Sequence, residues 1–131
     1  GAFPDIVRSI AETKLVDFWA MDIKHTPEKY PLASGNPDIA IESFQKSVKT
    51  IMESGTDYEF RTTVVPGIHT EDDFREIGTW IRGARRFALQ EFRDIKVYDS
   101  SLATRAKERS VNLEIARTHL LPFVKHVEIR R

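Results

Sequence analysis

The sequence predicts an α/β fold in which a parallel sheet of about four strands is flanked by helices. Short runs rich in β-branched and aromatic residues alternate with segments whose apolar residues recur every three or four positions. Such alternation is typical of parallel strands joined by right-handed helical crossovers. With 131 residues, 40% of them hydrophobic and 31% charged, the chain has the size and composition of a single globular domain, residues 1–131.

The first elements are a short helix and a strand. Pro4 opens a stretch with apolar residues at helical spacing, which predicts a helix at the start of the chain. The continuous apolar run over residues 16–23 predicts a strand that is covered on both faces. A loop is expected over residues 26–37, because this stretch is rich in Pro, Gly and Asn.

The segment after this loop predicts an amphipathic helix. Asp38 has a side-chain oxygen suited to capping its N-terminus, and Gly55 stands where helices commonly end. Apolar residues at spacings of three and four form one stripe that would face the core. They are Ile41, Phe44, Val48, Ile51 and Met52.

A second strand, another helix and a third strand follow. Residues 58–65 are rich in β-branched and aromatic side chains and stop at a Pro-Gly pair, as a strand would. Thr70 and Asp73 form a capping-box pattern that predicts a helix start, and Gly83 closes that helix. Residues 86–92 predict the third strand.

The last third of the chain begins with an irregular stretch. Residues 94–109 are polar and too long for a tight connection. Residues 111–121 then predict a helix, and residues 124–130 alternate apolar and polar side chains as an exposed edge strand does. Four strands are too few to close a barrel, so the pattern leaves two alternatives: an open sheet, or a slice of a larger barrel.

Composition excludes several classes of protein. Lys+Arg and Asp+Glu balance at 20 each, so no charge excess points to nucleic acid or to a membrane surface. The apolar runs are too short to cross a bilayer, and a cytoplasmic location is the default expectation. The absence of cysteine excludes disulfides, thiolate zinc sites and a thiolate-held iron–sulfur cluster within this chain. Gly1 stands where an initiator Met is expected, which we interpret as a fragment.

Polar residues at the carboxyl ends of the strands are the candidates for function, since ligands of α/β folds meet those ends. Asp22 and Lys24 are two positions apart and therefore share a face. A carboxylate and an ammonium held together would suit the zwitterionic end of an amino acid. The alternative is an ordinary surface ion pair.

Two other strands carry charged or polar candidates. Arg61 lies within the second strand, where a buried charge is costly unless it is paired. It would face a polar cavity or an exposed sheet face, or pair with Glu59 or another carboxylate. Gln90 and Arg93 stand at the end of the third strand, where they would orient a ligand or simply be solvated.

Two of the four histidines are candidates for metal ligands. His25 and His69 each follow a strand end and could be imagined beside Asp22, but the spacing matches no metal motif and two histidines are too few. We therefore predict no metal site. His119 and His126 are expected on the surface of the last helix and strand.

Three blocks of sequence resemble one family in its order and spacing. Residues 18–30 (FWAMDIKHTPEKY) resemble the fourth strand and following loop of radical S-adenosylmethionine (SAM) activating enzymes. Residues 58–69 (YEFRTTVVPGIH) resemble their fifth strand, and residues 88–93 (ALQEFR) their sixth. The chain is most similar to activating proteins of anaerobic ribonucleotide reductase, and pyruvate formate-lyase activating enzymes are similar at the same strands.

The resemblance implies the C-terminal half of a (β/α)6 partial TIM barrel. It implies an oxidoreductase whose full-length form holds a 4Fe-4S cluster through three cysteines, cleaves SAM reductively and generates a glycyl radical on a partner enzyme, here anaerobic ribonucleotide reductase. Asp22 and Lys24 match the pair that contacts the methionine part of SAM, and Arg61 matches an arginine lining the interior near SAM. Gln90 and Arg93 fall near sixth-strand positions that contact SAM.

The departure from the family pattern is the missing cysteine motif. Without thiolates the cluster cannot be held as the family holds it, so we expect no catalytic residue in this chain and no activity of the chain alone. The first strand of a half-barrel has an unpaired edge, which predicts self-association. The alternative from another class is a stand-alone α/β interaction module without catalytic activity.

Overall fold

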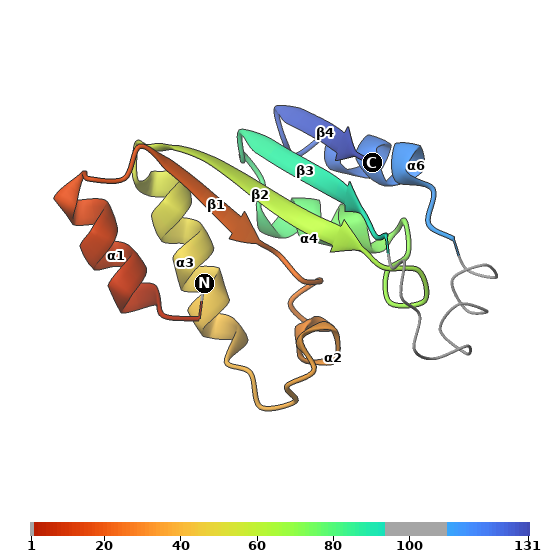
Figure 1. Cartoon of the computed structure of the whole chain (residues 1–131), viewed down its shortest axis with the longest axis horizontal. Coiled ribbons are helices and arrows are strands. Elements are labelled where there is room, and N and C mark those ends of the chain that lie inside the picture. The colour runs from red at the N-terminus through yellow and green to blue at the C-terminus, as the bar shows by residue number, and fades with distance from the viewer. Residues whose placement is uncertain (1, 94–109) are drawn as a thin grey trace.

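The computed structural model describes residues 2–93 and 110–131 (Figure 1). Its four strands are β1 (Phe18–Asp22), β2 (Asp57–Val64), β3 (Arg86–Glu91) and β4 (His126–Arg130). Its helices are α1 (Pro4–Thr13), α2 (Tyr30–Ser34), α3 (Ile41–Glu53), α4 (Asp73–Trp80) and α6 (Leu113–Leu120). The irregular stretch expected at residues 94–109 lies outside the described residues.

The strands form one parallel sheet in the order β1-β2-β3-β4, which confirms the predicted α/β fold. A parallel sheet in sequence order, with a helix in each described crossover, is consistent with half of a partial barrel. The register pairs Asp22 with Arg61, Arg61 with Ala88, and Ala88 with Glu128. These four positions therefore lie in one row across the same face of the sheet.

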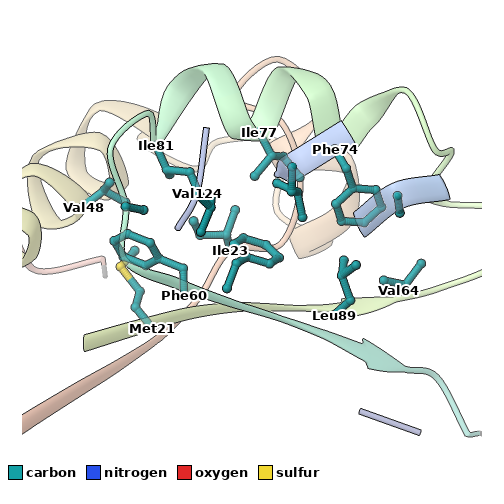
Figure 2. Packing of buried hydrophobic residues seen from close by; sticks show 14 of the residues in the cluster. Met21, Ile23, Val48, Phe60, Val64, Phe74, Ile77, Ile81, Leu89 and Val124 are labelled. Carbon is teal, nitrogen blue, oxygen red and sulfur yellow. The ribbon is translucent and has the colours of Figure 1, made fainter. Parts of the chain in front are cut away.

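The two faces of the sheet differ in polarity. The helices pack on one face, where apolar side chains fill the space between sheet and helices (Figures 1 and 2). The core labelled in Figure 2 consists of Met21, Ile23, Val48, Phe60, Val64, Phe74, Ile77, Ile81, Leu89 and Val124. The other face carries the polar and charged row positions, and no helix lies over it in Figure 1.

The expectation that the first strand is covered on both faces is wrong. In β1 only Met21 is fully buried, while Phe18, Ala20 and Asp22 are exposed on the uncovered face. The strand also begins at Phe18 rather than at residue 16. The apolar run in the sequence indicates which residues could be buried. The placement of the helices decides which face of the strand is buried.

Several helix ends also differ from the sequence prediction. The loop expected at 26–37 contains the short helix α2, and α3 begins after Ala40 rather than at a cap from Asp38. No side chain caps α4, but half of the predicted capping box is present because the Thr70 amide donates to Asp73 Oδ2 at 2.7 Å. Caps are decided by local competition among nearby polar groups, which spacing alone does not resolve.

The C-terminal helix and strand are close to their predicted places. Asn112 caps α6 by accepting hydrogen bonds from the amides of Glu114 and Ile115. Strand β4 is at the edge of the sheet, as predicted, and its side chains are partly exposed. Within residues 2–93 and 110–131, no helix has the length and apolarity needed to cross a membrane.

Candidate functional site at the strand ends

Asp22, Lys24 and Arg61 gather where β1 ends. The ladder continues one residue past β1, because the Ile23 amide donates to the Arg61 carbonyl at 2.8 Å. Arg61 Nε donates to Asp22 Oδ1 at 2.5 Å, and Lys24 Nζ lies 3.7 Å from Asp22 Oδ2. The parallel register that pairs Asp22 with Arg61 therefore places two cations against one carboxylate.

These three side chains remain open to solvent. Asp22 is 48% exposed, Lys24 54% and Arg61 45%. Ion pairs at such exposure contribute between about 0 and 1 kcal/mol to folding, so the fold does not depend on them. Arg61 pairs with a carboxylate, which was one of the alternatives left open by the sequence. That carboxylate is Asp22, because Glu59 is hydrogen-bonded to Arg130.

A cavity of about 390 Å³ is lined by Asp22 and Lys24, whereas Arg61 does not line it. Its walls come from the loop after β1, from α2 and α3, and from the loop after β2. Asp22, Lys24 and Thr63 supply polar groups, while Tyr30 and Phe44 contribute to the apolar part of the wall. A volume of this size is typical of sites for small molecules, which lie between about 300 and 1,000 Å³.

A second cavity, also of about 390 Å³, is lined by residues of α1, β1 and α3. It shares Asp22, Lys24, Tyr30 and Phe44 with the first cavity and is otherwise lined mainly by apolar groups, including Trp19. Among the described residues, Trp19 Nε1 is a buried side-chain donor that has no hydrogen-bond partner. Asp22 and Lys24 therefore line both cavities.

The structure does not bring Gln90 and Arg93 to this group. Gln90 is half-buried in β3, on the same sheet face as Arg61 and in register with Thr63. Arg93 lies beyond the end of β3, is 61% exposed, and has Glu91 Oε2 within 3.8 Å of its Nε. Neither residue lines the two cavities beside Asp22.

His25 and His69 are buried next to the site, and His69 lines the first cavity. Their rings stack with centroids 4.7 Å apart and planes 17° apart. All four ring nitrogens lie within hydrogen-bond distance of backbone groups. No group of three or more His, Cys, Asp or Glu suited to a metal ion occurs within residues 2–93 and 110–131.

Asp73 is buried beside these histidines and pairs with the exposed Lys29, and the sequence prediction did not include either residue in the site. Asp73 is buried; Lys29 Nζ donates to its Oδ1 at 2.8 Å, and the Thr70 amide donates to its Oδ2. Burial alone would raise the pKa of Asp73, but these hydrogen bonds outweigh it and the pKa is lowered. The same bond raises the pKa of Lys29. The sequence pattern identifies Asp73 only as a capping residue and gives no signal for Lys29.

The chain is similar to one curated protein of Methanocaldococcus jannaschii, which is named "Putative glycyl-radical enzyme activating enzyme". The two are 28% identical over 102 residues, which is 76% of this chain and 42% of the relative. The chain thus spans less than half the length of the relative it matches. No family model and no solved structure matches it. The comparisons support a distant relationship to glycyl-radical enzyme activating enzymes.

Proposed function

We propose that this chain is part of a radical SAM activating enzyme and holds the methionine end of SAM at the strand ends. The observation that carries the proposal is that Asp22 and Lys24 line a cavity of about 390 Å³ and that Arg61 pairs with Asp22. The name of the relative supports an activating function directed at a glycyl-radical enzyme. Anaerobic ribonucleotide reductase is the target we propose, on the resemblance of residues 58–69 to its activating proteins.

The chemistry of these side chains fits the amino-acid end of SAM. The Asp22 carboxylate accepts hydrogen bonds and would pair with the α-ammonium of the ligand. Lys24 and Arg61 are donors that would meet its α-carboxylate. Within the described residues Arg61 bonds a side chain only through Nε, so its terminal Nη donors remain for a ligand. Pairing with Asp22 holds the guanidinium in place before the ligand arrives.

The same residues do not fit a 4Fe-4S cluster. The chain has no cysteine, and thiolates are the usual ligands of such clusters. In this proposal the cluster belongs to a part of the enzyme outside these 131 residues. Bound SAM would supply the radical chemistry, while this chain binds and orients the amino-acid end.

Titration calorimetry with SAM tests the proposal. We expect wild-type binding weaker than about 1 μM, because the cluster that would share the amino-acid end is absent from the chain. Asp22→Asn and Arg61→Met should each weaken binding at least about tenfold, which corresponds to about 1.4 kcal/mol. Submicromolar binding by the wild-type chain would contradict this account, and so would no detectable binding at all.

The chain offers a matched pair of control variants. Asp57 and Arg86 form an exposed ion pair at 2.9 Å on the same face, at the opposite end of the strands. Asp57→Asn and Arg86→Met remove the same charges from similarly exposed positions and should leave SAM binding unchanged. If the control variants lose as much affinity as the Asp22 and Arg61 variants, the effect is one of net charge and the proposed site is wrong.

A stand-alone interaction module remains the second candidate function, and the exposed side of the molecule near β1 favours it. Phe3, Ile6, Leu15 and Phe18 are large apolar side chains with high exposure, and β1 is an edge of the sheet. Self-association through this edge stays a prediction. Light scattering at high protein concentration checks it, and a strictly monomeric mass would contradict it.

A further inference from the structure

The two buried histidines connect the loops on which the site stands. His25 belongs to the loop after β1, and its Nε2 lies 2.9 Å from the carbonyl oxygen of Ile68 in the loop after β2. His69 belongs to the loop after β2, and its Nε2 lies 2.8 Å from the carbonyl oxygen of Lys24 in the loop after β1. Each loop thus sends an imidazole to the backbone of the other.

The remaining ring nitrogens fix the tautomer of both rings. The Thr26 amide donates to His25 Nδ1 at 2.8 Å, and the Val65 amide donates to His69 Nδ1 at 2.9 Å. A nitrogen that accepts an N–H bond carries no proton, so in each ring the proton is on Nε2. That proton is donated to the carbonyl of the opposite loop. Both rings are therefore neutral, and each one bridges an amide and a carbonyl.

The surroundings oppose any other state of the pair. The His69 ring stacks on the rings of His25 and Phe74, whose centroids lie 4.7 and 5.9 Å from its own. Burial lowers the pKa of His69, which keeps the ring neutral. Among the described residues, the charged group that faces the pair is Asp73, which is itself paired with Lys29. Both Asp73 oxygens already accept hydrogen bonds, and Oδ2 lies 3.6 Å from His25 Nε2, beyond hydrogen-bond distance.

We propose that His25 and His69 are positioning residues for the strand-end site, with His69 fixing the Lys24 backbone and thereby the distance between the Lys24 and Asp22 side chains. The Lys24 side chain is exposed, and its ion pair with Asp22, at 3.7 Å, is open to solvent. Such a pair contributes little to holding the loop. The bond from His69 to the Lys24 carbonyl supplies that restraint. The effect on a ligand rests on the proposed function, whereas the restraint on the loop does not.

Two variants of His69 separate the two bonds of its ring. The glutamine side-chain amide nitrogen can occupy the position of Nε2, so His69→Gln keeps the donor to the Lys24 carbonyl and loses the acceptor for Val65. The asparagine amide oxygen can occupy the position of Nδ1, so His69→Asn keeps the acceptor and loses the donor. Each variant removes one hydrogen bond, and a purely structural role predicts similar behaviour of both.

The experiment measures SAM binding and the Lys24 carbonyl 13C chemical shift in both variants of the full chain. We expect His69→Asn to weaken binding by about three- to tenfold, the equivalent of one neutral hydrogen bond, and to move the Lys24 carbonyl resonance. His69→Gln should leave both near the wild-type values. Arg86→Met, which removes the ion pair with Asp57 at the opposite end of the strands, serves as a control that should alter neither.

The results distinguish the two proposals from each other. If the wild-type chain does not bind SAM, the proposed function fails, and the carbonyl resonance alone then decides whether His69 restrains the loop. Equal shifts of that resonance in both His69 variants would overturn the positioning role. Should either variant fail to fold, the ring 15N chemical shifts of the two histidines in the wild-type chain test the assigned tautomers instead. A protonated Nδ1 in either histidine would overturn the proposal, and protonated Nε2 in both would support it.

Discussion

Replacing Arg130 with methionine removes the two hydrogen bonds that Glu59 receives from its guanidinium, at 2.7 and 2.6 Å. The pair joins β4, which carries Arg130, to β2, which carries Glu59, and therefore crosses β3. Ala88 of β3 lies in the row of the sheet between these two residues and is fully buried. The small alanine side chain leaves room for the pair to close over it. The pair therefore ties the edge strand to the centre of the sheet.

The magnitude follows from burial. The Glu59 side chain is 11% exposed and that of Arg130 is 35% exposed. Breaking a fully buried pair costs about 3–5 kcal/mol, because the remaining charge is left without a partner. Exposed pairs contribute about 0–1 kcal/mol. Since water reaches Arg130 but hardly reaches Glu59, we expect a loss of about 2 kcal/mol in the free energy of unfolding, between these two cases.

Urea denaturation of the purified chain measures this loss as a lower midpoint at an unchanged slope. Arg86→Met is the matched control, since Arg86 and its partner Asp57 are 47% and 43% exposed, and we expect it to cost less than about 1 kcal/mol. Adding Glu59→Gln to Arg130→Met should restore part of the stability by removing the unpaired charge. Equal losses for the two arginine variants, or no recovery in the double variant, would refute the reasoning.

Three further outcomes are expected. Gly78→Ala should destabilise α4 packing by about 1–3 kcal/mol, because the added Cβ would lie 2.4 Å from Phe123 Cδ2; a rise in Tm would contradict this. Stability should fall as pH drops below 6.5. The pKa of His69 is lowered from that value in the folded chain, so the unfolded chain binds a proton that the folded chain does not. The slope reaches about 1.4 kcal/mol per pH unit for one proton, and a second loss follows below 3.8 from the lowered pKa of Asp73; an unchanged profile in His69→Gln near pH 6 would count against the assignment. Asn112→Ala should cost about 1 kcal/mol in thermal unfolding by removing the α6 cap, whereas Asn112→Asp should keep most of it.

Much of the fold could be predicted because its signals are local. The β-branched runs and the helical spacing of apolar residues identify each main strand and helix, and β4 is the edge strand that its alternating pattern indicates. The misplaced cap at Asp38 and the missed helix α2 have a different cause. At such places several nearby polar groups or a proline offer competing local structures of similar energy, and spacing does not choose between them.

The candidate site was predictable only in part. Asp22 and Lys24 could be placed on one face from the period of a strand, and they lie within 3.7 Å. The partner of Arg61 could not be chosen from the sequence, which left Glu59 and other carboxylates open. The register decides it, because Asp22 is aligned with Arg61 across β1 and β2 while Arg130 occupies Glu59 from the far edge.

The sequence by itself determined the order of the elements, the apolar face of each helix and the presence of polar residues at the strand ends. The tertiary structure decided which face of the sheet stays open, which arginine meets which carboxylate, and that His25 and His69 meet next to the site. The physical reason is the separation along the chain of the residues that each feature depends on. Helical and strand periodicity arise within a few residues, whereas these pairings join segments far apart in the chain, and their geometry exists only once the strands are in register and the helices are packed.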